Sequence, residues 1–231
     1  AVDANEEAYE DHALFAVTAD GVVIEGFTLK LGVYNIFVEQ ARDVEIRNNF
    51  FNTSRRYHIY MVDASDVIIA GNRSRVGRYN FLTTDHCSGC LIENNYHYED
   101  PCGYMLVDSD RNTIRANHFD SLSWYGVTLS NSDNNVVENN LFEGGRICGL
   151  QTRGTSIGNR IVRNTFFSNR TEAVLMTGGS RNNEVHQNNI AGNRGLAVTN
   201  ETAYRLDAVK NWWGSADGPA GAGPGDGDTV D

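Results

Sequence analysis

The sequence predicts an all-β fold, a right-handed, single-stranded parallel β-helix (solenoid) of about nine coils with 22–24 residues each. Three observations lead to this prediction. An apolar residue recurs at that spacing, an asparagine follows it three positions later in almost every coil, and a segment of alternating apolar and polar residues precedes it. We expect residues 1–213 to form the β-helix domain and residues 214–231 to form a Gly/Asp-rich C-terminal tail.

One central apolar residue anchors each repeat. A single coil cannot bury its apolar face alone, so repeats of this kind stack on their neighbours. The period is too short for a β-propeller blade, which needs about 40 residues, and the L-x-x-L-x-L pattern of leucine-rich repeats is missing. The anchors are Ile24, Ile46, Ile69, Ile92, Ile114, Val137, Ile161, Val185 and Ala208.

Asparagines occupy the third position after the anchor in every coil except the first, where Phe27 stands. Asparagine tolerates the left-handed backbone conformation better than other non-glycine residues, which suits a tight corner. Stacked asparagine side chains can also form hydrogen bonds along a column. We therefore expect an inaccessible asparagine ladder at left-handed corners, made by Asn49, Asn72, Asn95, Asn117, Asn140, Asn164, Asn188 and Asn211.

The segment before each anchor alternates between apolar and polar residues, as in GYMLVDSDRNTI and GVTLSNSDNNVV. This period of two is typical of a half-buried strand. Each coil should therefore carry two or three short strands joined by corners, and no helical periodicity interrupts them.

Composition restricts the partners of the chain. The formal charge is −11 and the pI is near 4.9, which argues against non-specific binding of nucleic acid. No apolar run is long enough to predict a membrane span. There is no basic-then-apolar leader, and the repeat is already regular at Ala13, so we expect further coils or domains of a longer chain.

The register of the repeat groups outward side chains into columns. One column contains Asp63, His86 and Asp108 in successive coils, with Asp85 beside it and Tyr60 on the same face. A histidine between carboxylates could act as a general acid or base, so these four polar residues are the catalytic candidates. The alternative is an ordinary polar face on an exposed strand.

Aromatic and basic residues near the start of the same strands are the substrate-binding candidates. Tyr60 belongs with them, since aromatic rings on a β-helix face can stack on the apolar faces of sugars. Arginines could pair with a uronate carboxylate or neutralise an acidic polysaccharide. The alternatives are corner packing for the rings and charge balance for the arginines. The other candidates are Tyr57, Arg78, Tyr79, Trp124, Tyr125 and Arg153.

The cysteines invite a metal-site interpretation, because Cys87 and Cys90 stand next to His86. Register instead assigns Cys87 and Cys90 to core columns. Cys102 and Cys148 fall two coils apart and in different parts of the coil, too far for a disulfide. We therefore expect buried thiols, no metal site and no cofactor.

The repeat resembles the NosD-like and carbohydrate-binding/sugar-hydrolase (CASH) group of parallel β-helix proteins. The resemblance covers residues 13–214 and rests on G-I-x-L-x-x-S-x-x-N-x-I-x-x-N-x-F-like units, clearest at 103–119 and 126–142. The ending Asn211-Trp212-Trp213-Gly214 looks like the close of such domains in secreted proteins, which implies an extracellular, cell-surface or periplasmic location.

Members of this group include polysaccharide lyases, hydrolases, uronan epimerases, phage tailspikes and a periplasmic protein linked to copper-site maturation. The chain lacks Gly-His-Gly, Arg-Ile-Lys, Asp-Pro-His-Asp and the calcium nonapeptide, so no single enzyme class is favoured. The resemblance implies an extracellular scaffold that binds polysaccharide and, if it is an enzyme, acts as a lyase, epimerase or glycoside hydrolase. The alternative is a non-catalytic surface, assembly or periplasmic accessory module of NosD type, acting in metal-site maturation.

Overall fold

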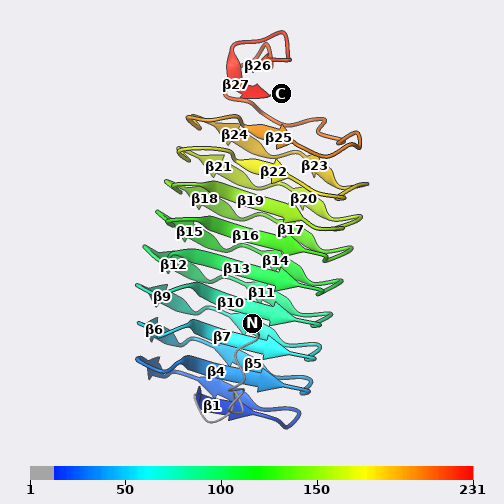
Figure 1. The fold of residues 1–231 in the computed structure, drawn as a ribbon. Helices are drawn as coiled ribbons and strands as arrows, with labels where there is room; N and C mark the ends of the chain where they lie inside the picture. The colour runs from blue at the N-terminus through cyan, green and yellow to red at the C-terminus, as the bar shows by residue number, and fades with distance from the viewer. Residues whose placement is uncertain (1–12, 231) are drawn as a thin grey trace, which may run out of the picture.

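The computed structural model describes residues 13–230, which form a right-handed parallel β-helix (Figure 1). Each coil contributes one strand to each of three parallel sheets, which we call sheets A, B and C. Sheets B and C contain eight strands each, so eight coils are complete. The predicted fold class is therefore confirmed, and the expected ninth coil, around Ala208, is incomplete: it has a strand in sheet A and only isolated bridges elsewhere.

Sheet A is the largest sheet and has 11 strands. In stacking order they are β1 (Ala13–Val17), β4 (Tyr34–Glu39), β7 (Tyr57–Val62), β10 (Asn80–Asp85), β13 (Cys102–Val107), β16 (Tyr125–Ser130), β19 (Cys148–Arg153), β22 (Val174–Met176), β25 (Val198–Asn200), β27 (Gly227–Val230) and β26 (Pro219–Gly221). Its first seven strands have five or six residues and form the long face of each coil.

Sheets B and C are built from short strands that follow in sequence. Sheet B contains β2 (Val23–Glu25), β5 (Glu45–Arg47), β8 (Ile68–Ala70), β11 (Leu91–Glu93), β14 (Thr113–Arg115), β17 (Val136–Glu138), β20 (Arg160–Val162) and β23 (Glu184–His186). Sheet C contains β3 (Thr28–Leu29), β6 (Phe50–Asn52), β9 (Arg73–Arg75), β12 (Tyr96–Tyr98), β15 (His118–Asp120), β18 (Leu141–Glu143), β21 (Thr165–Phe167) and β24 (Asn189–Ala191).

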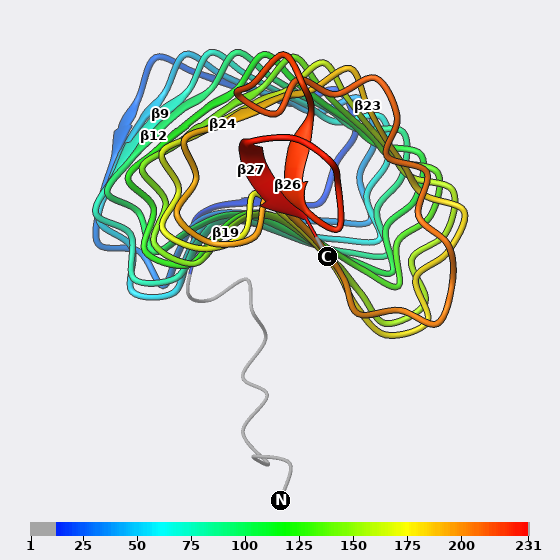
Figure 2. The same ribbon diagram turned by 90° about the horizontal axis from the view of Figure 1, so that it is seen from above.

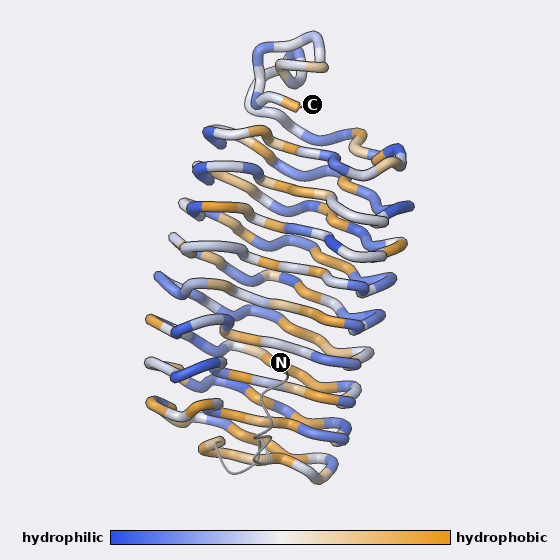
Figure 3. The backbone as a smooth tube through the Cα atoms, viewed as in Figure 1, coloured by the Kyte–Doolittle hydropathy of each residue, from blue (hydrophilic) through white to orange (hydrophobic). Residues whose placement is uncertain are grey.

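The core consists of columns of like residues. The anchors pair directly, with Ile46 opposite Ile69 and Ile69 opposite Ile92, and all three are fully buried. Sheet C adds a ring stack in which Phe142 lies 4.7 Å from the rings before and after it. Figure 3 shows the resulting alternation of hydrophobic and hydrophilic segments around each coil. No helix within residues 13–230 has the length and apolarity needed to cross a membrane.

The asparagine column lies inside the corner between sheets B and C. The Oδ1 atom of Asn95 accepts hydrogen bonds from the backbone N–H (2.9 Å) and from Nδ2 (3.0 Å) of Asn72, and Asn95 Nδ2 donates to the carbonyl of Ile69 (2.9 Å). The same pattern repeats at Asn117 and Asn140. Each asparagine thus connects three successive coils.

The expectation of left-handed backbone at these asparagines is wrong. Positive φ belongs instead to the residue before each of them, for example Asn48 (54°), Asn94 (55°) and Ala116 (53°). The exposed preceding residue makes the sharp turn. The buried asparagine has a backbone conformation outside the left-handed region. Its side chain forms hydrogen bonds with backbone groups of the neighbouring coil, which would otherwise be buried without partners.

Two further hydrogen-bonded columns follow the same principle. One contains Asn112, Asn135, Asn159 and Asn183, and it begins at the backbone N–H of Cys90. The other ends at Asp228, whose carboxylate accepts hydrogen bonds from Gly192 and from the backbone and side chain of Asn193. Strands β26 and β27 lie over the centre of the last coil (Figure 2), so this segment covers part of the core there.

Candidate functional site

A groove crosses the outer face of sheet A over β10 and β13. It encloses about 250 Å³. Its walls and floor come from five successive coils and include five aromatic residues and one arginine. The lining residues are Tyr57, Tyr79, Asn80, Cys102, Tyr104, Met105, Trp124, Tyr125, Thr128 and Arg153.

The groove exists because two coils carry small residues where their neighbours carry rings. Strands β7 and β16 begin with Tyr57 and Tyr125, whereas β10 and β13 between them begin with Asn80 and Cys102. Parallel strands lie roughly 4.8 Å apart, so the two tyrosines stand about 14 Å apart along the stack. Between these tyrosines, over the width of two coils, the smaller side chains of Asn80 and Cys102 leave a depression in the surface.

The wall on the β7 side is a packed group of aromatic rings. The ring of Tyr60 lies 5.3 Å from Tyr34, 5.6 Å from Phe37 and 5.7 Å from Tyr57. The guanidinium of Arg56 covers the ring of Tyr57 at 5.2 Å and donates a 2.9 Å hydrogen bond to the hydroxyl of Tyr34. Tyr60 therefore supports this wall from behind and does not line the groove.

The groove has an exposed aromatic rim where the strands begin. Trp124 is 51% exposed and Tyr79 is 43% exposed, which is unusual for such large side chains. The guanidinium of Arg78 stacks over Tyr79 at 5.8 Å. Burial raises the pKa of Tyr125, although the positive charge of Arg153 acts in the opposite direction. Five of the seven predicted substrate-binding residues thus line one groove, and Tyr60 and Arg78 pack behind its aromatic residues.

The predicted catalytic residues lie at the other end of the same strands. Asp85 ends β10, His86 follows it, and Asp108 follows β13. His86 Nδ1 lies 2.8 Å from Asp85 Oδ1, and one ligand atom from each of the three residues lies within 4.8 Å of the others. Asp63 belongs to the preceding coil and is outside this group. His86, Asp108 and Asp63 all have positive φ (54°, 44° and 50°), so they form the corner after the strand and are not strand residues.

A buried polar network that sequence reasoning missed lies behind the groove. Asp100 is fully buried, accepts a 2.6 Å hydrogen bond from Gly77 N–H and a second from Ser74, and lies 3.8 Å from His58. Ser74 also contacts His97 Nδ1 (2.7 Å), and His97 Nε2 contacts the hydroxyl of the groove residue Tyr104 (2.7 Å). Ser74 and His97 occupy the inward position of sheet C that holds Phe51 and Phe119 in the flanking coils, which is the signal that could have revealed the network.

Burial and neighbouring charges set the ionisation of this network. Burial alone would raise the pKa of Asp100, but His58, His97 and the Ser74 hydroxyl together hold it below its usual value. Burial lowers the pKa of His97 to about 3. The carboxylate of Asp100 and the neutral imidazole of His97 are therefore buried on the inner side of the coils in which β10 and β13 begin.

The four thiols are buried and free, as register predicted for the Cys87 and Cys90 pair. Burial raises the pKa of Cys87 to about 12 and that of Cys90 to about 11, so neither offers a thiolate at neutral pH. One expectation is wrong. Cys102 and Cys148 lie in the same column, because both begin strands of sheet A and only the coil of Tyr125 separates them.

Two groups of side chains in residues 13–230 could hold a metal ion. One is Asp85, His86 and Asp108. The other lies on sheet C, where His118 Nε2 is 3.0 Å from Glu143 and Asp120 accepts a 3.0 Å hydrogen bond from a tyrosine hydroxyl. Each group offers one imidazole nitrogen and two carboxylates.

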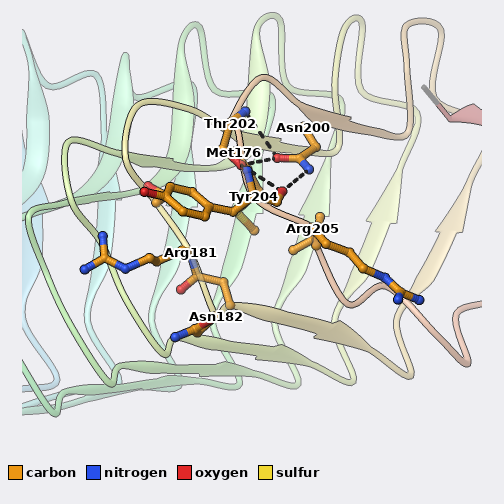
Figure 4. Close-up of a pocket in the computed structure, with 10 residues that line it drawn as sticks. Met176, Arg181, Asn182, Asn200, Thr202, Tyr204 and Arg205 are labelled. Atoms are coloured by element: carbon orange, nitrogen blue, oxygen red, sulfur yellow. Dashed lines mark hydrogen bonds between the residues drawn. The ribbon is translucent and has the colours of Figure 1, made fainter.

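A second hollow, near the C-terminal end, is too small for a ligand. It encloses about 10 Å³, roughly the space of one water. Figure 4 shows Arg181 and Arg205 pointing away from one another, so they do not converge on a bound group. The hydroxyl of Ser180 is buried there without a hydrogen-bond partner, which one water would satisfy.

Several solved structures are similar to this chain. A double mutant of the periplasmic alginate epimerase AlgG matches with a TM-score of 0.72 and 16% identity over 81% of this chain and 50% of that one. The exopolygalacturonase from Thermotoga maritima matches with a TM-score of 0.53 and 14% identity over 73% and 44%. DFA-IIIase from Arthrobacter chlorophenolicus A6 matches with a TM-score of 0.58 and 15% identity over 75% and 50%.

These identities establish the fold alone, and the chain spans about half the length of the structures it matches. No curated protein matches the sequence. The sequence model of one family, described as periplasmic copper-binding protein (NosD), matches residues 1–95 and 53–218, which is most of the chain. With its parallel β-helix fold, the chain belongs to the NosD family.

Proposed function

We propose that this chain is a carbohydrate-binding β-helix of the periplasm or cell exterior, and that the groove over β10 and β13 binds a glycan. The observation that carries the proposal is the set of exposed rings at the rim, Tyr79 and Trp124, above a floor of small residues. Sugar rings present apolar faces that stack on aromatic side chains, and a concave site with a few polar groups is the usual form of a binding pocket.

The comparisons support this proposal. Similar structures include an alginate epimerase and an exopolygalacturonase, and both of these names refer to a polysaccharide. The family description places its members in the periplasm. The chain shares its fold with these proteins, and a glycan is the partner whose chemistry suits the groove.

The Asp85, His86 and Asp108 group gives the proposal a catalytic version. A general acid or base must lie within hydrogen-bond reach of the proton that it transfers. Only a sugar that extends to the far end of β10 and β13 would reach these side chains. We therefore propose binding as the primary function, with modification restricted to ligands long enough to reach that end.

A glycan array followed by calorimetry tests the proposal. Trp124→Ala should weaken binding about fivefold to thirtyfold, because stacking on one ring contributes on the order of 1–2 kcal/mol. The matched control is Phe167→Ala on sheet C, an equally exposed ring (49%) outside the groove, which should leave binding unchanged. Failure of the wild-type chain to bind any glycan, or equal effects of both substitutions, would contradict the proposal.

A second candidate is binding of divalent copper, and the two groups of one imidazole and two carboxylates favour it. Such nitrogen and oxygen ligands suit Cu²⁺, whereas Cu⁺ prefers sulfur ligands, and the buried thiols do not provide thiolates. Copper bound there would supply a positive charge on the surface of sheet A or sheet C. Electron paramagnetic resonance of Cu²⁺ titrations should show a signal that survives Cys87→Ser with Cys90→Ser and is lost in His86→Ala with His118→Ala. A signal unaffected by the histidine substitutions would exclude these sites.

A further inference from the structure

The aromatic rim of the groove belongs to a row of apolar side chains at the corner between sheets C and A. The row contains Tyr79, Pro101, Trp124 and Ile147, which directly precede β10, β13, β16 and β19. The first three lie in coils joined by backbone hydrogen bonds, since Cys102 N–H donates to the carbonyl of Tyr79 (3.3 Å) and Trp124 N–H to that of Pro101 (2.8 Å). Pro101 is half-buried and the other three side chains are exposed.

This row runs parallel to the axis of the solenoid and crosses the direction of the strands. Figure 1 shows β10, β13, β16 and β19 stacked one above another, and each row residue stands at the beginning of one of them. Neighbouring coils are roughly 4.8 Å apart, so Tyr79 and Trp124 lie two steps, or roughly 10 Å, apart along the stack. The compact ring of Pro101 lies between them. The row therefore offers two exposed aromatic side chains at a fixed spacing.

The spacing of the two rings suits one geometry of sugar chain. A chain of β-1,4-linked pyranoses is an extended ribbon that advances by about one strand spacing with each sugar. If one sugar stacks on Tyr79, the next lies over Pro101 and the third stacks on Trp124, since the apolar faces of sugars pack on aromatic rings. An α-1,4-linked chain of the same sugars curls, so it loses one of the two rings.

A ligand lying along the strands would use the row poorly. Tyr79 precedes β10 and Trp124 precedes β16, so a chain that follows one strand meets at most one of the two exposed rings. Such a chain would instead run from Asn80 towards Asp85, five positions or about 16 Å further along β10. Only a chain parallel to the solenoid axis contacts both exposed rings.

From this arrangement we infer that the row binds the main chain of an extended β-1,4-linked glycan, which runs parallel to the solenoid axis with alternate sugars on Tyr79 and Trp124. The inference rests on the proposed glycan binding and adds the linkage and the direction of the ligand. The main chain stays at the beginning of the strands, so it does not contact Asp85 and Asp108 at their far end.

Oligosaccharides of increasing length test the direction by NMR titration. The probes are the di- and trisaccharides of β-1,4-linked glucose, xylose and mannose, and the series that binds most tightly is used with the variants. A third sugar should raise the affinity about fivefold to thirtyfold, because it reaches the second ring. Tyr79→Ala should remove this gain and leave the disaccharide bound at Trp124. The matched control, Phe167→Ala on sheet C, should keep the gain.

A ring added to the row tests the spacing in the opposite sense. Ile147 lies one coil beyond Trp124, so Ile147→Trp should raise the affinity for the tetrasaccharide, whose fourth sugar reaches the new ring, and leave the trisaccharide unchanged. The matched control is Val209→Trp, which adds a ring at an equally accessible position (51% exposed for Val209) outside the row and should change neither affinity.

Linkage and the far end of the strands complete the design. Cellotriose and maltotriose contain the same three glucose units, and the β-1,4-linked cellotriose should bind about fivefold or more tightly than its α-1,4-linked isomer. Asp85→Asn with Asp108→Asn should leave the affinity for the β-1,4-linked trisaccharide unchanged, because the main chain does not reach these side chains.

The outcomes distinguish this inference from the proposed function. Equal or tighter binding of maltotriose would overturn the inference, as would a gain from the third sugar that persists in Tyr79→Ala or a loss of affinity in the double aspartate variant. A chain that binds other glycans of the array but none of the three β-1,4-linked series would also overturn it, and in each of these cases glycan binding itself would stand. Failure of every glycan to bind would overturn the proposed function.

Discussion

Removal of one asparagine from the middle of the column should destabilise the whole chain. In Asn95→Ala, the backbone N–H of Asn72 loses its acceptor and the carbonyl of Ile69 loses a donor, both in the fully buried corner. Asn117 is less affected, because its Oδ1 still accepts from the backbone N–H of residue 95 and from Tyr104. Two buried groups losing their partners, at about 1–3 kcal/mol each, give a loss of roughly 2–6 kcal/mol.

The matched control lies at the end of the same column. Asn211 accepts the corresponding hydrogen bonds from Asn188, but it is only half-buried, so water can replace its side chain. We expect Asn211→Ala to cost about 1 kcal/mol or less, as for a partly solvated hydrogen bond.

Urea denaturation followed by circular dichroism measures both losses. The midpoint should fall much further for Asn95→Ala than for Asn211→Ala, with the slope of unfolding free energy against urea unchanged in both. If the two substitutions lower the midpoint equally, hydrogen bonds in the buried corner contribute no more than solvated ones, and the reasoning is refuted.

Three further predictions concern packing, pH and the thiols. Gly126→Ala should destabilise the chain by a few kcal/mol, because an added Cβ would lie 2.5 Å from the carbonyl of Gly149 and from the Phe142 ring. A thermal unfolding midpoint equal to that of the wild type would contradict this prediction. His97 is neutral when folded, with a pKa of about 3 against 6.5 when unfolded, so stability present above pH 6.5 should be lost progressively as the pH falls towards 3. Urea midpoints at pH 7 and pH 5 check this, and His97→Gln should show a weaker dependence. All four cysteines should resist a thiol reagent at neutral pH until urea unfolds the chain, since burial raises each thiol pKa; rapid labelling of the folded chain would disagree.

The sequence is sufficient to predict the fold because register repeats. The anchors from Ile24 to Val185 pair along sheet B, each with the anchor of the next coil, and the same register placed Cys87 and Cys90 in the core. The left-handed residue could not be assigned from the asparagines, because the conformational preference of asparagine and its hydrogen-bonding capacity point to different positions. In the structure, hydrogen bonding determines where the asparagine lies, and exposed residues such as Ala116 make the turn.

The groove is harder to predict because it is a local absence of large side chains. Sequence reasoning identified the rings of Tyr57, Trp124 and Tyr125 but not the floor, since Asn80 and Cys102 carry no motif and matter only by being smaller than their neighbours. The buried network around Asp100 was missed for a related reason: polar residues within a strand are normally assigned to the surface. Residues 214–231 have no repeat from which β26 and β27 could be recognised.

The column architecture has a consequence for how such a groove can change. Its walls, Tyr57 and Tyr125, belong to coils a whole number of steps apart, and every coil presents the same hydrogen-bonding pattern to the next. Insertion or deletion of one coil between them would therefore change the groove width by a single strand spacing, about 4.8 Å. The hydrogen bonds and side-chain packing between neighbouring coils would stay the same. Width in this architecture is quantised, so ligand size can change in discrete steps while the fold stays the same.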